Sequence, residues 1–422
     1  MEGGAARFRG VARHLTLFAG LSALFIAGTV LHPQFLTIAN QRDVLAQVSI
    51  NGILAVGMTL VILTAGIDLS VGSVMSLCTV VCAMLLMERP GLDFRSLSRA
   101  HWLAWLAFLL FLGWAGMAAI RHLGRARRAA QWASSIGCLV MALAVLLNWG
   151  RVAGWINSGS STGAVLVAIP LVGGMLGLLN GAIIAQTRLQ PFIVTLAMMV
   201  SAVGLAKFIA GHGGEIHAIY TGDGGHAGAP ASFEQLGATI LTVGQEALRG
   251  GRVRELKLIP IPGLFMLGAW LSAAFILHKL PLGRYIYAVG GNEEAARLAG
   301  VPVAGVKVFA YTASGLLAGL AAVLYCAQYT QGKADAGLGK ELDAIAAVVI
   351  GGTSLMGGRG SILGTLVGVM IFGYLTNILQ LRAVSSEIQD ILKGVIIVGA
   401  AVAQSGDVLG GLRNFWLRRQ VT

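Results

Sequence analysis

The sequence predicts an all-α membrane protein, a polytopic helical bundle of about twelve transmembrane segments joined by polar connections. The first supporting observation is composition: the 422 residues are 56% hydrophobic and only 11% charged, too few charges to cover a soluble protein of this size. The second is a mean hydropathy of +0.79, which comes from long apolar runs. The third is that basic residues gather in alternate connections between these runs.

Each expected span is an apolar run near the length of about 20 residues that a helix needs to cross the hydrocarbon core. A basic stretch precedes the first run without a convincing cleavage site behind it, so this run is expected to stay as an uncleaved span. The tenth run is short for a regular span. The expected spans are residues 15–31, 44–65, 69–87, 102–120, 132–149, 163–185, 192–210, 262–279, 306–328, 342–356, 361–380 and 388–404.

The placement of charge predicts the orientation. With a cytosolic N-terminus, alternation of the spans puts four basic clusters on the cytosolic side, including those at both ends of the chain. Basic residues outnumber acidic ones in those connections and balance them in the outer connections, as the positive-inside rule requires. Both termini are therefore expected in the cytosol, and the net charge of +12 reflects topology rather than nucleic-acid binding.

The longest connection, residues 211–260, is expected as an external loop. Its segment 231–248 has apolar residues at helical spacing, which predicts a helix lying along the membrane interface. The histidines in its Gly-rich first part are interpreted as solvated, and no metal site is predicted. The four cysteines all fall inside apolar segments, where we interpret them as small packing residues rather than disulfide partners.

Polar residues inside apolar runs mark candidate sites, because an unpaired polar group is costly in a membrane. Asp68, followed by Ser70, fits either a helix N-cap near the cytosolic surface or a position on a translocation path. Asn180 must find a hydrogen bond, more often from a neighbouring helix than from a substrate. Thr195 lies in the next apolar run and is a further candidate.

Glycines interrupt two apolar pieces between residues 341 and 379, as in a broken helix. The first piece of about 15 residues, or about 22 Å, would not cross the membrane fully. Unwound backbone at Gly351, Gly352, Thr353 and Ser354 would then offer polar groups to a path. The alternative is a tight cytosolic turn between ordinary spans.

One polar stretch in the second half of the chain holds a short helix, 293–299, with marked ends. Asn292 can cap its N-terminus, Glu293 and Glu294 complement the helix dipole, and Gly300 ends it. A helix of about 10 Å is too short to be stable alone. It therefore needs a surface to dock against, which is a shape suited to transmitting motion.

Enzyme motifs are missing from the sequence. The nearest approach to a Walker A motif, at 337–342, lacks the leading glycine and the Ser/Thr that would hold magnesium. A GxSxG match at 159–163 lies in a loop that enters a span, without the strand–turn–helix setting of a nucleophile elbow. We expect a chain that is not an enzyme, binds no cofactor and cannot hydrolyse ATP alone.

Five segments together resemble the permease subunits of bacterial ABC importers for monosaccharides, the ribose/xylose/arabinose group. They occur in the order of that family and span most of the chain. They are residues 66–73, 177–186, 191–199, 283–301 and 341–368.

This resemblance implies a single permease domain over 1–422, a multi-pass protein of the bacterial inner membrane that works as a homodimer beneath an external sugar-binding protein. Its cytosolic loop, 281–305, would hold a coupling helix that docks on a separate ATPase subunit, which binds the ATP and magnesium. The residues implied in coupling are Gly291, Asn292, Glu293, Glu294, Ala295, Ala296, Arg297 and Gly300. The candidates for the translocation path are Asp68, Ser70, Asn180, Thr195, Gly351, Gly352, Thr353 and Ser354.

The resemblance also bears on the cargo. The helical hairpin at 102–149 is an insertion into a family core of about ten spans, and the greater length is similar to that of xylose-type permeases. A xylose-like pentose is therefore the favoured cargo. Two alternatives stay open: an ABC permease for branched-chain amino acids or nucleosides, and an ion-coupled secondary carrier that would use Asp68.

Overall fold

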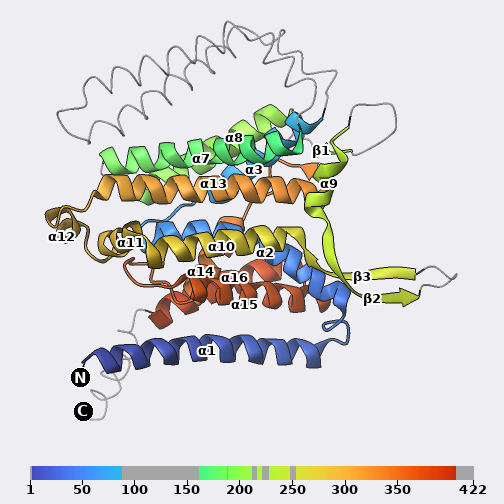
Figure 1. Ribbon diagram of the computed structural model, residues 1–422, viewed down its shortest axis with the longest axis horizontal. Helices are drawn as coiled ribbons and strands as arrows, with labels where there is room; N and C mark the ends of the chain where they lie inside the picture. Colours follow the sequence, from blue (N-terminus) through green and yellow to red (C-terminus); the bar gives the residue numbers. More distant parts are fainter. Residues whose placement is uncertain are drawn as a thin grey trace, which may run out of the picture.

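The structure is a computed structural model that describes residues 2–87, 161–187, 189–211, 216–220, 228–247 and 253–404. Most of its helices run along one common axis and form a bundle (Figure 1). The long elements are α1 (Glu2–Leu31), α2 (Ile38–Leu63), α3 (Val71–Leu86), α7 (Thr162–Thr187), α8 (Pro191–Ala210), α10 (Ile261–Lys279), α13 (Val303–Tyr329), α15 (Ile362–Leu381) and α16 (Ser386–Gln404). The shorter helices are α9 (Ala231–Gly237), α11 (Pro281–Gly291), α12 (Glu293–Leu298) and α14 (Lys340–Ile350).

The helical bundle predicted from the sequence is confirmed. Six helices are long and apolar enough to cross a membrane, namely α2, α7, α8, α10, α13 and α15, while α3 and the apolar part of α1 are shorter. The short span expected at 342–356 is the 11-residue helix α14. The spans expected at 102–120 and 132–149, with the rest of the inserted hairpin, lie outside the described residues, so the total of about twelve stays a prediction.

The connection 211–260, expected as an external loop, contains strands that the sequence analysis did not predict. The interfacial helix expected over 231–248 is wrong beyond Gly237, because β2 (Thr239–Ala247) pairs antiparallel with β3 (Val253–Pro260). β2 begins with Thr, Ile, Leu, Thr and Val, which suit a strand, and β3 supplies the hydrogen-bonding partner that a single segment cannot reveal. A second small pair joins β1 (His217–Ala218) to β4 (Gln331–Gly332), so the fold is not strictly all-α.

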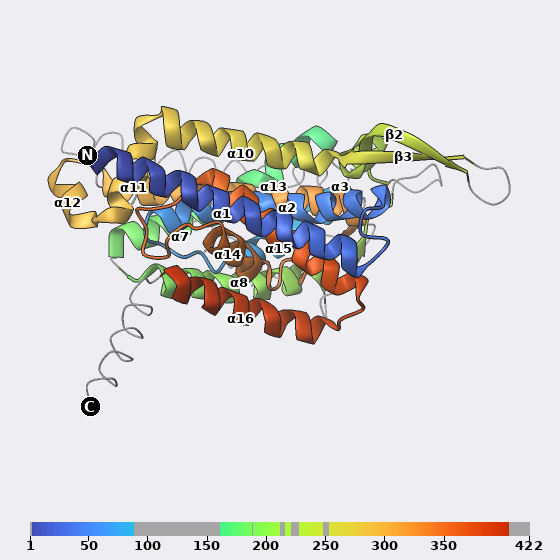
Figure 2. The same cartoon turned by 90° about the horizontal axis from the view of Figure 1, so that it is seen from below.

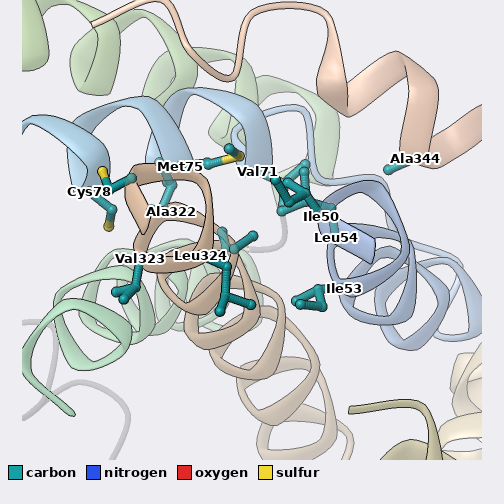
Figure 3. Close-up of a cluster of buried hydrophobic side chains, with 14 of the residues drawn as sticks. Ile50, Ile53, Leu54, Val71, Met75, Cys78, Ala322, Val323, Leu324 and Ala344 are labelled. Carbon is teal, nitrogen blue, oxygen red and sulfur yellow. The ribbon is translucent and has the colours of Figure 1, made fainter. Parts of the chain in front are cut away.

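The core lies where α2, α3 and α13 meet. Figure 3 shows side chains of α2, α3 and α13, among them Leu54, Met75 and Leu324, gathered in one buried cluster. Cys78, Cys82 and Cys326 are free thiols that are fully buried, which confirms their interpretation as packing residues. The fourth cysteine lies outside the described residues.

Helices α7 and α13 touch through their backbones. A Cβ atom on Gly177 of α7 would clash with the carbonyl oxygen of Tyr311, and one on Gly315 of α13 would clash with the carbonyl oxygen of Gly173. Small residues allow this approach in lipid, where packing rather than the hydrophobic effect holds helices together. The contact makes α7 and α13 a closely packed pair.

The two ends of the bundle differ. At one end lie α11 and α12 together with the start of α1, and at the other end the β2–β3 hairpin projects (Figures 1 and 2). We call these the α12 end and the hairpin end. The C-terminal end of α16 also lies toward the α12 end (Figure 2), so the first described helix begins and the last one ends on the same side of the bundle. That this side is cytosolic stays a prediction.

We predict that Gly177→Ala lowers the melting temperature of the detergent-solubilised protein, because the added methyl group forces α7 and α13 apart at a cost of about 1–3 kcal/mol. The control is Gly268→Ala in α10, where a Cβ atom would meet nothing within 4 Å. That change should be neutral or slightly stabilising, since alanine favours helix over glycine by about 1 kcal/mol. Equal melting temperatures for the two variants would contradict the backbone contact.

Candidate functional site

The short helix α12 has the ends that the sequence predicted. The side-chain oxygen of Asn292 accepts a hydrogen bond from the backbone N–H of Ala295 at 2.9 Å, and Gly300 follows the helix at a φ of +81°. The helix spans Glu293–Leu298, with Ala299 as its C-cap, so it is one residue shorter than the expected 293–299. The eleven-residue helix α11 precedes it and was not expected.

Ion pairs hold α12 against α13. Glu293 lies 2.6 Å from the Nζ atom of Lys307, at the start of α13, and 2.9 Å from the guanidinium of Arg297. Arg297 also lies 3.4 Å from Glu294, whose side chain is 68% exposed. Of the residues implied in coupling, Glu293 thus ties α12 to the bundle, whereas Glu294 faces outward. Ala296 lies on the buried side of α12, whereas Gly291, Ala295 and Gly300 are exposed.

Three backbone segments meet at the base of α12. The backbone N–H of Gly358 donates to the carbonyl oxygen of Leu63, at the end of α2, at 3.1 Å. A Cβ atom on Gly290 of α11 would clash with that same carbonyl, and one on Gly358 would lie 2.6 Å from the Cα atom of Gly291. We call Leu63, Gly290, Gly291 and Gly358 the backbone joint. At Gly290 and Gly358 it leaves no room for a side chain between the end of α11, the end of α2 and the loop 351–361.

The loop 351–361 is a tight turn at the α12 end, which favours the turn among the two sequence-based alternatives. It follows α14, a helix too short to cross a membrane, so part of the broken-helix interpretation also holds. Gly351 and Gly352 are buried, with Gly351 packed on Gly364 of α15; Thr353 is 0% exposed, and Ser354 is half-buried.

Asp68 lies in a buried hydrogen-bond cluster that links three helices. One carboxylate oxygen accepts from the backbone N–H of Ser70 at 3.0 Å and from its hydroxyl at 2.6 Å, and the other accepts from the hydroxyl of Ser314 in α13 at 2.9 Å. The side-chain amide of Asn180 in α7 donates to the Ser70 hydroxyl at 2.9 Å. Ser70, rather than Asp68, is the N-cap residue of α3.

This cluster gathers the first four path candidates around the irregular segment 64–70. Thr195 of α8 is buried, and its hydroxyl lies 3.0 Å from the carbonyl oxygen of Pro191 in its own helix and 3.3 Å from that of Ile67. The helix-to-helix bond expected for Asn180 is confirmed, and its remaining oxygen has no protein partner among the described residues. The other four candidates lie apart, in the loop 351–361.

A cavity of about 250 Å³ lies between α12 and the irregular segment. Its polar lining includes Asn292, Glu293, Lys307 and Tyr311, and its other walls come from residues 64–66, the end of α11 and the facing ends of α7 and α8. The base of α12 and the segment that carries Asp68 therefore border the same space.

The sequence analysis did not predict a charged cluster that joins α14 to α2 and α16. Lys340 of α14 donates to the side-chain oxygen of Asn51 in α2 at 3.0 Å. Lys393 of α16 lies 3.2 Å from Asp343 of α14 and 3.2 Å from Asp390. Lys393 is the eighth residue of α16 and so lies about 10 Å along that helix. The charges were visible in the sequence, but their pairing across α14 and α16 was not.

Comparisons with known proteins place these features in a family. Residues 41–401 match the family model described as branched-chain amino acid transport system / permease component. The ribose import permease protein of Escherichia coli strain K12 is 35% identical over 390 residues, covering 92% of each chain. That of Bacillus subtilis strain 168 is 35% identical over 395 residues, covering 94% of each chain.

A third relative is more distant. The autoinducer 2 import system permease protein of Yersinia enterocolitica serotype O:8 / biotype 1B is 30% identical over 257 residues, which cover 60% of this chain and 72% of the relative. All three relatives are described as permeases. No solved structure matches this chain.

We predict that Ser314→Ala lowers the melting temperature, because it removes the hydroxyl that α13 donates to Asp68 and leaves one buried carboxylate oxygen without a partner, at a cost of about 1–3 kcal/mol. Ser272→Ala is the matched control, since that exposed hydroxyl bonds only the carbonyl of Gly268 in its own helix, at 2.8 Å. A melting temperature for Ser314→Ala as high as that of the control would show that the Asp68 cluster does not hold α13.

Proposed function

Because the chain belongs to the family of ABC-importer permeases that includes the ribose import permeases, we propose that it is the membrane-spanning subunit that carries a monosaccharide across the bacterial inner membrane. The observation that carries this proposal is α12, a capped helix at one end of the bundle whose base is fixed by the backbone joint. A helix built in this way suits the transfer of force from another subunit.

The energy would come from a separate ATPase subunit that binds ATP and magnesium and receives α12. Two rigid connections lead from α12 into the bundle. The Glu293–Lys307 ion pair leads to α13, which contacts α7 through its glycines and Asp68 through Ser314. The backbone joint leads to α2 and to the loop before α15. Closure of the ATPases would therefore move several spans together, as rigid-body switching requires.

The uncovered face of α8 and α16 suits a second copy of the chain. These helices lie on the same side of the bundle, opposite α10 (Figure 2). The large side chains that α10 exposes between Leu264 and Phe275 are apolar, as lipid contact requires, and its exposed His278 and Lys279 lie in its last turn, whereas the charged side chain of Asp390 in α16 is 74% exposed. Since charges facing lipid are costly, we propose that a second copy covers this face and that the path runs between the copies.

The path candidates from the sequence stay predictions. Asp68, Ser70, Asn180 and Thr195 are buried in this conformation, so cargo would reach them only after segment 64–70 moves. The cavity beside this segment and α12 supports such a movement, because it leaves space on the side from which the force would arrive.

For the cargo we propose a pentose. Two of the named relatives import ribose, while the extra length of this chain argued for a xylose-like sugar. Specificity would reside mainly in the external sugar-binding protein. An ion-coupled carrier is disfavoured, because both carboxylate oxygens of Asp68 already accept hydrogen bonds inside the bundle.

The proposed function is tested by reconstituting the tagged chain in vesicles with the ATPase and binding protein from the same organism. We expect uptake of labelled ribose or xylose that requires ATP and the binding protein, and none of labelled leucine. A binding screen on the sugar-binding protein would then name the cargo. Uptake driven by an ion gradient without ATP would overturn the proposal.

We predict that Glu293→Lys combined with Glu294→Lys abolishes ATP-driven uptake in these vesicles while the protein still inserts. The double change reverses the charge of the outer face of α12 and also breaks the ion pair with Lys307. Unimpaired uptake by the inserted double variant would contradict the coupling assignment.

Single variants distinguish a residue that contacts the ATPase from one that transmits the movement of α12 to the bundle. Glu294→Lys alters only the exposed side of α12 and should weaken co-purification of the ATPase. Lys307→Gln removes the tie to α13 without changing that exposed side, so the ATPase should still co-purify while sugar transported per ATP hydrolysed falls severalfold. Loss of co-purification in Lys307→Gln would show that this residue supports docking rather than transmission.

A further inference from the structure

Two apolar side chains protrude at the α12 end. Met356, in the loop 351–361, is 85% exposed, and Leu298, in α12, is 83% exposed. Among the large apolar side chains of the described residues these are the highest values. Both residues lie on a short helix or a turn rather than on a spanning helix, so lipid contact along the bundle does not explain their exposure.

The exposure of Leu298 follows from the proposed coupling. Within α12, Glu294 and Leu298 are four residues apart and both exposed, while Ala296 is buried. Residues at this spacing share one face of a helix. Leu298 thus adds an apolar contact to the outer face of the coupling helix, beside the charge of Glu294. Met356 has no such explanation.

The turn around Met356 is built to hold this side chain outward. Ser354 and Arg359 close the turn with a backbone hydrogen bond of 2.8 Å, and the N–H of Gly357 donates to the carbonyl oxygen of Ser354 at 3.0 Å. Gly357 and Gly358 adopt φ values of +80° and +66°, which other residues rarely take. The backbone on both sides of Met356 is therefore fixed, and only its side chain projects.

The same turn forms part of the backbone joint. Gly357 packs against Ala65 and Gly358 against Gly291, and the next residue after Gly291 caps α12. The turn that holds Met356 and the helix that holds Leu298 therefore share one rigid base. A subunit that seats on α12 would meet the neighbouring turn as well.

We propose that Met356 is a second docking contact for the ATPase subunit, inserted in an apolar recess of that subunit next to the groove that receives α12. This inference rests on the proposed function and extends the docking surface from the loop 281–305 to the loop 351–361. It gives the ATPase a direct contact to the segment between α14 and α15, in addition to the route through the joint. A long flexible thioether suits such an adaptable apolar contact.

The test measures the affinity of the detergent-solubilised full chain for the purified ATPase subunit. We expect Met356→Glu to weaken binding about ten- to hundredfold, since a methionine side chain that is buried in the complex would be replaced by a charged one. Val243→Glu is the control: Val243 is 51% exposed on β2, at the hairpin end, and its substitution should leave the affinity unchanged. Met356→Cys should also form a cross-link to the ATPase that is absent from Val243→Cys.

The outcomes separate this inference from the proposed function. If the unchanged protein binds the ATPase and Met356→Glu binds equally well, the second contact is wrong while the coupling helix stands. Cross-linking of Met356→Cys to a second copy of the permease would also overturn it. So would modification of this cysteine only by thiol reagents that are carried on lipids. If the unchanged protein binds no ATPase, the proposed function itself fails.

Discussion

The contact on which the proposed coupling depends is the meeting of three backbones at Leu63, Gly290 and Gly358. A side chain at position 290 would occupy the space of the Leu63 carbonyl, so the end of α11 can approach α2 this closely only because residue 290 is glycine. A hydrogen bond from Gly358 to the same carbonyl fixes the turn before α15 at that point. Because backbones in direct contact cannot slide without breaking the packing, a displacement of the end of α11 would carry α2 and this turn with it.

The membrane explains why so many internal contacts are of this kind. In lipid there is no hydrophobic drive between helices, so close backbone packing and internal hydrogen bonds hold the bundle together. Helices α7 and α13 pack their backbones closely through glycines, and the Asp68 cluster supplies internal hydrogen bonds at the irregular segment 64–70. The charged residues of α14 and α16 are paired with one another, which lowers their cost inside the bundle.

Local signals in the sequence predicted most of the helices and the ends of α12. The cap at Asn292 and the stop at Gly300 depend on a few neighbouring residues, and both are confirmed. The strand β2 was missed because its apolar residues also fit a helix, and the hydrogen bonds from β3 decide between the two. Likewise, Leu298 escaped the sequence analysis, because which face of a short helix points outward depends on what lies beneath it.

By itself, the sequence determined the membrane class, six of the apolar spans and the family, since these depend on composition, run length and ordered motifs. Only the tertiary structure decided how the polar residues are used: Asp68 and Asn180 join helices, and Glu293 ties α12 to Lys307 rather than only facing outward. The physical reason is that a polar group in a membrane must find a partner, and the partner comes from a segment far away in the chain.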